Sequence, residues 1–204
     1  MNFGFLGAFI MFALLISYNI RRQSRASRNN EKDFWARELK SNSVRRKSLD
    51  GLNYIRIPLE SFPTHILNEN STVMECIDTL ETLTDQKIVN LTGWTNTDLK
   101  LEYGTANITA LTEYDQNYTL LVRTLQKWAD ELIAANYHKE ASVLMEFAVS
   151  TSTDVSQTYY HLADYWISRG EPGQVERLIR TAEGLRSASR NTIVRHLKEK
   201  SGQC

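Results

Sequence analysis

Cysteine is scarce in this chain of 204 residues, which contains Cys76 and Cys204 and no Cys-x-x-Cys pair. This scarcity argues against a disulfide framework and against a zinc site. Cys76 falls on the apolar side of a predicted helix. We therefore expect it to be a buried structural thiol rather than a nucleophile.

Catalytic and metal-binding motifs are also lacking. The chain has four histidines, which are His65, His138, His161 and His196. They show neither His-x-x-x-His nor His-Glu-x-x-His spacing, so no metal site is predicted. The turn at Gly170 and Gly173 lacks the Lys-Ser/Thr of a phosphate-binding loop. We therefore expect a protein that is not an enzyme and that uses no cofactor.

One segment leaves an alternative open. Residues 94–118 mix aromatic and polar side chains without a clear period, and Asp98 and Asp115 are among them. Such a mixture either lines a binding surface or docks a connection onto a helical body through hydrogen bonds. We favour the second interpretation. A small enzyme that uses Asp98, Asp115 and the neighbouring tyrosines is the least favoured hypothesis.

An excess of one charge is absent from the whole chain, but the charges are distributed unevenly. Residues 21–50 hold ten Lys or Arg and four Asp or Glu, whereas residues 51–204 hold fourteen and twenty. The larger part is therefore acidic, and it shows no basic stripe with interleaved aromatics. This pattern argues against nucleic-acid binding. The basic stretch is predicted to be a juxtamembrane linker.

The most informative feature present is an apolar run. Residues from Phe3 to Ile20 carry no charge over 18 positions. A helix of this length spans about 27 Å, close to the hydrocarbon thickness of a bilayer. A cleaved secretory signal is the alternative, but no basic side chain precedes the run and no small-residue cleavage site follows it. We therefore predict a single-pass transmembrane anchor over residues 1–20.

The charges after this run predict its orientation. Four arginines follow it closely, and these are Arg21, Arg22, Arg25 and Arg28. The positive-inside rule then places the N-terminus outside the cell membrane and the C-terminal domain in the cytoplasm. The same arginines are candidates to attract anionic lipid. In the alternative topology the domain lies outside, as a chaperone-like or envelope-assembly factor. Four Asn-x-Ser/Thr triplets and the signal-like start support that alternative.

The rest of the chain is predicted to be all-α. Helices are expected over residues 31–40 and 68–83, and an extended segment over 52–59 is expected to lie across the helical body. A short helix over 97–103 is predicted to be capped at Thr97 and closed by Gly104. The predicted division of the chain is an anchor (1–20), a basic linker (21–50), a helical or irregular packing segment (51–117), and helical repeats with a cap helix (118–204).

The C-terminal half matches itself when it is shifted so that Leu125 falls on Tyr159. With the same offset, the further pairs are Trp128 with Leu162, Ala129 with Ala163, Leu132 with Trp166, Ala141 with Val175, Met145 with Ile179, and Ala148 with Ala182. Asn136 falls on Gly170, and these two residue types best tolerate the left-handed conformation that ends a helix. Each unit is therefore predicted to be a helix, a tight turn and a second helix.

Three further signals complete this helical prediction. Asp154 is predicted to be an N-cap, and Pro172 to occupy the first turn of a helix. Residues 191–200 are predicted to form a terminal helix that caps the open face of the stack with Ile193, Val194 and Leu197.

This pattern resembles the tetratricopeptide repeat, whose period of about 34 residues is the offset found here. Leu162-Ala163-x-x-Trp166 stands where that family has Leu-Gly-x-x-Tyr, and Trp128-Ala129-x-x-Leu132 fits the same place in the first unit. The resemblance covers about residues 120–187. Val175 departs from the family, because it replaces a small residue, and no proline closes either unit.

The resemblance implies a groove lined by the first helix of each unit, where a peptide of a protein partner binds. The positions that it implies are Arg123, Gln126, Lys127, Asp130, Gln157, Tyr160, His161 and Asp164. Arg123 and Lys127, one turn apart, are expected to pair with a carboxylate of the ligand. A solvated helix face with local ion pairs is the plainer interpretation. We predict a non-catalytic adaptor that holds a protein partner at the membrane.

Overall fold

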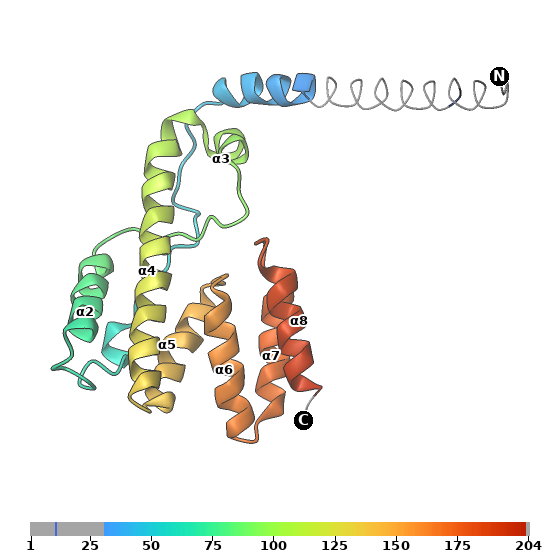
Figure 1. The fold of residues 1–204 in the computed structure, drawn as a ribbon. Coiled ribbons are helices and arrows are strands. Elements are labelled where there is room, and N and C mark those ends of the chain that lie inside the picture. The colour runs from blue at the N-terminus through green and yellow to red at the C-terminus, as the bar shows by residue number, and fades with distance from the viewer. Residues whose placement is uncertain (1–10, 12–30, 203–204) are drawn as a thin grey trace, which may run out of the picture. The chain divides into compact units, whose positions relative to one another are not determined.

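The computed structural model describes Met11 and residues 31–202, and the helices account for most of these residues (Figure 1). The elements are a helix over residues 31–42, η1 (Leu59–Ser61), α2 (Ser71–Thr84), α3 (Asn96–Tyr103), η2 (Thr105–Asn107), α4 (Ile108–Ala134), α5 (His138–Ser150), α6 (Ser156–Ser168), α7 (Pro172–Glu183) and α8 (Arg190–Ser201). No strand occurs among the described residues, so the all-α prediction is confirmed for them.

Most of the predicted membrane segment lies outside the described residues. This applies to the anchor over residues 1–20 apart from Met11, and to the four arginines of residues 21–28. Within the part of the chain that is described, no helix has both the length and the apolar character needed to cross a bilayer.

The chain forms two compact units. The smaller unit combines the chain up to Ser48 with Thr95–Ile108, and the larger unit combines Leu49–Trp94 with the chain from Thr109 onwards. The predicted boundaries at residues 20, 50 and 117 stay predictions.

In the smaller unit, the helix over residues 31–42 packs its polar side on α3. The Glu38 carboxylate accepts a hydrogen bond from Thr97 Oγ1 at 2.8 Å and forms an ion pair with Lys100. Arg37 pairs with Asp98 at 2.5 Å. These bonds join segments that lie far apart in the sequence, and so they define the unit.

A buried asparagine completes this unit. Asn107 is 1% exposed, accepts a hydrogen bond from Arg46 Nε at 3.0 Å, and donates to the carbonyl oxygens of Lys47 and Tyr103 at 2.8 and 2.7 Å. Because a buried amide is stable only when its donors and acceptor are satisfied, these three bonds hold residues 46–47 against the end of α3.

The start of α3 corrects the prediction that Thr97 is its N-cap. Thr95 is the N-cap, and its side chain and that of Asp98 form a reciprocal capping box with each other's backbone N–H. Thr97 lies inside the helix, and its hydroxyl donates a hydrogen bond to the Glu38 carboxylate instead. The predicted C-terminal glycine is confirmed, because Gly104 ends the helix with a φ of 87°.

Acidification should detach the helix over residues 31–42 from α3. The hydrogen bond from Lys100 lowers the pKa of Glu38, and the hydrogen bond from the Thr95 side chain lowers the pKa of Asp98. A carboxylate whose pKa is depressed by folding stabilises the fold above its unfolded pKa, and this contribution is lost as the pH falls through its folded pKa. Amide protection factors in this contact should therefore start to fall below about pH 5, near the unfolded pKa values of the two carboxyls, and fall further as the pH passes below their lowered folded pKa values. Glu38→Gln should already show low protection at neutral pH, and protection that stays constant in the wild type would contradict the expectation.

In the larger unit, one hydrophobic core joins α2 to the helices α4–α8. Val73, Leu80 and Leu83 of α2 are buried in it, as is Cys76, whose pKa is raised by that burial. The prediction of a buried structural thiol is therefore confirmed. The segment over residues 52–58 has no strand partner, and it lies on the core through the half-buried Ile55 and Ile57. Ile55 N donates to Ile88 O at 2.9 Å.

Two helical hairpins follow in the larger unit, α4–α5 and α6–α7, and their turns have the same backbone geometry at matched positions. Asn136 and Gly170 both have a positive φ, 66° and 71°. Tyr137 N donates to Leu132 O at 2.8 Å in the first turn, and Glu171 N donates to Trp166 O at 3.0 Å in the second. Both turns thus satisfy the last carbonyls of the preceding helix in the same way. The predicted left-handed conformation is confirmed at both positions.

The matched apolar positions of the two hairpins are buried in six of the seven pairs. The exception is Leu132 with Trp166. Leu132 is buried, whereas Trp166 is half-buried and donates from its indole Nε1 to Glu146 Oε1 at 3.1 Å. These buried positions belong to the hydrophobic core of the larger unit, and the polar positions of α4 and α6 lie outside that core.

The caps of the second hairpin agree with the sequence in one case and differ in the other. Pro172 occupies the first turn of α7, as predicted. Asp154 is not the N-cap of α6, because that position belongs to Val155. The Asp154 carboxylate accepts a hydrogen bond from Ser187 Oγ at 2.6 Å, which ties it to the turn before α8. The predicted cap helix is confirmed as α8, which buries Ile193 and Leu197.

The two turns should respond differently to substitution. Gly170→Ala should lower the free energy of unfolding by about 1–2 kcal/mol, because alanine is strained at positive φ. Asn136→Gly should leave it unchanged or raise it by less than about 1 kcal/mol, since glycine adopts this conformation freely. Gly173→Ala is the matched control. It lies in the first turn of α7 with open space around its Cβ position, so it should stabilise the protein by about 0.5–1 kcal/mol. Urea unfolding followed by circular dichroism measures all three, and a neutral Gly170→Ala would contradict the geometry of the turn.

Candidate partner-binding surface

The polar sides of α4 and α6 are joined by one hydrogen bond and one close contact between charged groups. Gln126 of α4 donates from Nε2 to Asp130 Oδ1 at 2.6 Å and accepts from Thr158 Oγ1 of α6 at 2.6 Å. His161 Nε2 of α6 lies 3.8 Å from Asp130 Oδ1. Gln126, Asp130 and His161 remain at least partly exposed, whereas Thr158 is buried. The two helices therefore present one continuous polar surface.

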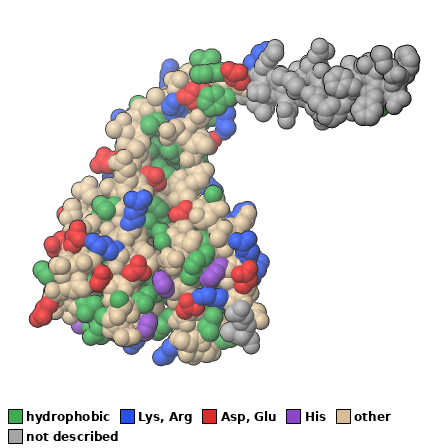
Figure 2. Space-filling model, in the orientation of Figure 1, with side chains coloured by type: hydrophobic (Ala, Val, Ile, Leu, Met, Phe, Trp, Pro, Cys, Tyr) green, Lys and Arg blue, Asp and Glu red, His purple; other side chains and the backbone are tan. Residues whose placement is uncertain are grey.

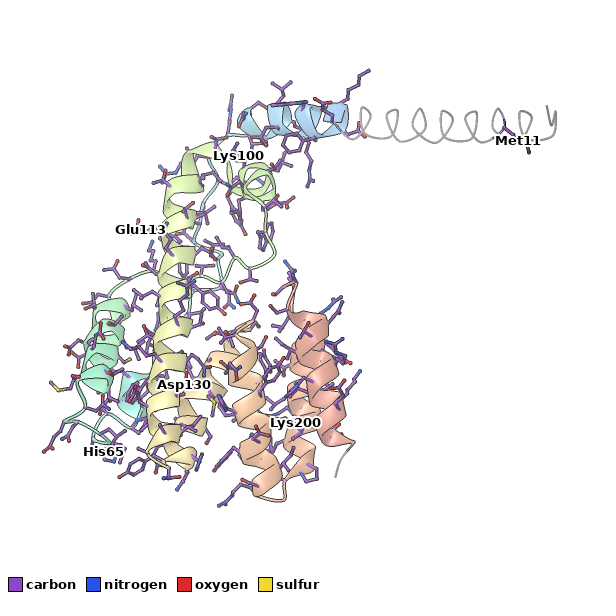
Figure 3. All side chains as sticks on the ribbon, in the orientation of Figure 1. Met11, His65, Lys100, Glu113, Asp130 and Lys200 are labelled. Atoms are coloured by element: carbon purple, nitrogen blue, oxygen red, sulfur yellow. The ribbon has the colours of Figure 1, made fainter. Side chains whose placement is uncertain are left out.

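The last helix extends this surface beyond α6. Tyr160 stacks on His196 of α8 with ring centroids 3.8 Å apart, and Asp164 forms an ion pair with Lys200. Figure 3 shows Asp130 on α4 and Lys200 on α8, on either side of α6. The surface thus consists of three neighbouring helices, α4, α6 and α8, rather than the two that the sequence predicted.

A signal for this third helix was present in the sequence. A second shift by the repeat offset places Ile193 on Tyr159 and Leu197 on Ala163, and all four side chains are buried. The sequence-based prediction assigned residues 191–200 to a cap and did not extend the match to them. His196 and Lys200 were therefore missed as members of the surface.

The predicted residues do not all gather on this surface. Gln126, Asp130, Tyr160, His161 and Asp164 make the contacts described above, and Arg123 and Gln157 are exposed on the same two helices.

Lys127 points to the other side of α4. Its Nζ contacts Glu75 Oε2 of α2 at 2.7 Å, and this hydrogen bond raises the pKa of Lys127. Lys127 thus forms an ion pair within this chain, and the expected pairing of Arg123 and Lys127 with a ligand carboxylate stays a prediction.

A groove of about 690 Å³ opens beside this surface, at the turn of the first hairpin. Its lining comes from the end of α4, the turn after it, α5 up to Met145 and the second half of α6. The lining consists of Ile133, Asn136, His138, Lys139, Glu140, Met145, His161, Asp164, Tyr165, Ser168 and Arg169. Met145 is the buried member, whereas Lys139 and Arg169 are exposed cations. Only His161 and Asp164 were predicted from the sequence, since the other lining residues come from the turn, from α5 and from positions of α4 and α6 outside the predicted rows.

The mixed segment over residues 94–118 is held by its own hydrogen bonds. Asp115 accepts from Leu91 N at 3.1 Å, and Asn117 donates to Lys87 O at 3.1 Å. Tyr118 donates to Thr151 O at 3.2 Å, and burial raises its pKa to about 12. These contacts support the interpretation of this segment as a structural connection. In the described part of the chain, no group of acidic, histidine and cysteine side chains is arranged to hold a metal ion.

Comparisons with known proteins identify no relative. No protein-family model matches the chain, and neither curated proteins nor solved structures contain a match.

Proposed function

We propose that this protein is a non-catalytic, membrane-anchored adaptor that binds a protein partner at the cytoplasmic face of the cell membrane. The observation that carries this proposal is the surface of α4, α6 and α8, where contacts between side chains align three helices beside an open groove. Two hairpins with matching turns support a tetratricopeptide-like array, in which stacked hairpins form an extended binding surface.

The chemistry of the groove suggests the kind of partner. Lys139 and Arg169 supply exposed cations, Glu140 and Asp164 supply carboxylates, and Tyr165 supplies an aromatic side chain. This mixture suits a peptide segment that carries acidic and apolar side chains. The hydroxyl of Ser168 in this groove donates to the carbonyl oxygen of Tyr165 rather than to a histidine, which favours a binding role over nucleophilic catalysis.

The proposed anchor holds the partner-binding domain at the membrane. An anchored adaptor raises the concentration of its partner near the membrane without additional contacts. The topology is tested by protease protection on right-side-out and inverted vesicles, with a tag after Cys204. Cleavage of the domain only in inverted vesicles supports the cytoplasmic assignment, whereas cleavage only in right-side-out vesicles would favour the extracytoplasmic alternative.

The groove is tested by charge reversal. Lys139→Glu combined with Arg169→Glu should remove partners that co-purify with the full chain from solubilised membranes. Arg190→Glu combined with Arg195→Glu is the matched control, because it makes the same change of charge at exposed positions of α8 that line a different depression. If both double variants retain the same partners as the wild type, the groove is not the binding site.

A further inference from the structure

The helix over residues 31–42 exposes large apolar side chains. Phe34 is 54% exposed, Trp35 is 57% exposed and Leu39 is 71% exposed. Phe34 and Trp35 contact each other edge to face, with ring centroids 5.5 Å apart. Figure 2 shows green atoms gathered on this helix.

In this helix, large apolar side chains are exposed while polar residues contact protein, which is the reverse of the usual pattern for a helix on the surface of a soluble domain. The side chains of Arg37 and Glu38 contact α3, and the backbone carbonyl oxygen of the buried Ser41 accepts a hydrogen bond from Thr105 Oγ1. Trp35 and Leu39 lie one turn apart, and about 200° around the helix from Arg37 and Ser41 respectively. A soluble domain buries its apolar side and exposes its polar side. Glu38 and Ser41 are thus shielded by protein, whereas Trp35 and Leu39 face outward.

The position of the helix in the chain limits what can cover that apolar side. Ten residues separate the predicted anchor, which ends at Ile20, from the start of the helix. Fully extended, they reach at most about 35 Å. If the apolar run spans the bilayer, the helix is confined within that distance of the membrane surface.

The charges on both sides of the helix complement an anionic membrane. Residues 21–28 carry four arginines, and Arg45, Arg46 and Lys47 follow the helix. The helix itself carries three acidic and three basic side chains, so the excess of cations lies in its flanks. Basic segments of this kind are attracted to anionic headgroups, and tryptophan is enriched at the interface between headgroups and acyl chains.

We propose that the helix over residues 31–42 lies flat on an anionic membrane surface, with Trp35 and Leu39 inserted at the boundary between headgroups and acyl chains. This inference rests on the proposed membrane anchor. The polar side of the same helix binds α3, so the helix holds the smaller unit against the bilayer.

A depth measurement on the full chain tests this placement. Leu39→Cys is introduced together with Cys204→Ser, and the cysteine is labelled with a small fluorophore. Cys76 is buried, and a chain with Cys204→Ser alone serves as the labelling blank. Met74→Cys on α2 is the matched control, because Met74 is also a large apolar side chain and is 50% exposed. The proteins are reconstituted into vesicles of phosphatidylcholine and phosphatidylglycerol, and flotation measures membrane association.

The expected result is severalfold stronger quenching of the label at position 39 than at position 74 by lipids brominated on their acyl chains. Aqueous iodide should show the reverse order. Adding Trp35→Glu to the Leu39→Cys chain should reduce the lipid quenching towards the level of the control. Replacing phosphatidylglycerol with phosphatidylcholine should also weaken it.

Three results would overturn the inference, and they can be told apart. A chain that does not float lacks the anchor, so the proposed function fails together with the inference. A chain that floats, with position 39 as accessible to iodide as position 74, leaves the adaptor function intact and excludes the membrane-surface helix. A label at position 39 that is shielded from iodide, but not quenched by brominated lipid, shows that a protein surface covers the helix.

Discussion

Replacing Trp128 with alanine should lower the free energy of unfolding of the larger unit by about 3–5 kcal/mol, the usual range for a buried aromatic side chain. Trp128 is 0% exposed in the middle of the core. Its ring contacts Phe62 edge to face with centroids 6.1 Å apart, and Phe62 contacts Phe147 of α5 at 5.4 Å. The loss should be large because this ring links α4 to the segment before α2 and, through Phe62, to α5.

Trp128→Phe gives a sharper comparison at the same position. The indole Nε1 of Trp128 is buried and has no hydrogen-bond partner among the described residues. Phenylalanine removes that unsatisfied donor and keeps most of the apolar volume, so its loss should be well below that of alanine. Trp35→Ala, at an exposed position, is the control and should change stability by less than about 0.5 kcal/mol. Urea unfolding of the full chain in mild detergent, followed by circular dichroism, measures all three. If the free energy of unfolding of the alanine variant were within about 1 kcal/mol of the wild-type value, Trp128 would not be a major contributor to the stability of the core.

Replacing Gly104 with alanine should be the most damaging single change in the smaller unit. Its backbone has a φ of 87° and a ψ of 148°, a region that is almost restricted to glycine and costs other residues about 1–3 kcal/mol. In addition, a Cβ atom would lie 2.5 Å from the carbonyl oxygen of Arg45. Because this oxygen belongs to the backbone, the segment must move. Overpacking of this kind costs about 1–3 kcal/mol more.

Hydrogen exchange is the measurement that locates this damage. Gly104→Ala should remove amide protection at Lys47, whose N–H donates to Tyr103 O at 3.0 Å. Gly170→Ala is the matched control, because it also has a positive φ but no atom within 4 Å of the added Cβ. It should cost only the conformational penalty and leave residues 45–48 protected. Equal effects of the two variants would mean that Arg45 does not approach Gly104 closely.

The two wrong cap predictions show where local patterns stop being sufficient. Thr97 and Asp154 are both suitable N-cap residues by type. In the structure, the Thr97 hydroxyl bonds Glu38 and the Asp154 carboxylate bonds Ser187. These partners are distant in the sequence, so the residues that neighbour Thr97 and Asp154 do not reveal them. Thr95 was identifiable locally, because Asp98 three residues later completes a capping box.

The surface of α4, α6 and α8 was predictable in part. The resemblance to the tetratricopeptide repeat implied five of its members on α4 and α6, at positions that helical spacing places together on one face of each helix. It did not show that Lys127 turns to Glu75, since this depends on where α2 packs. The groove was not predictable either, because its volume arises where a turn, the start of α5 and the side of α6 meet.

The sequence by itself determined the helical class, the left-handed turns at Asn136 and Gly170, and the burial of Cys76. These features follow from backbone sterics and from the period of apolar side chains, which act over a few residues. Only the tertiary structure decided that Tyr160 meets His196, that Asp164 meets Lys200, and that Glu38 joins the first described helix to α3. Such contacts depend on how packed helices bring distant side chains within a few ångströms of one another, and no local pattern encodes that proximity.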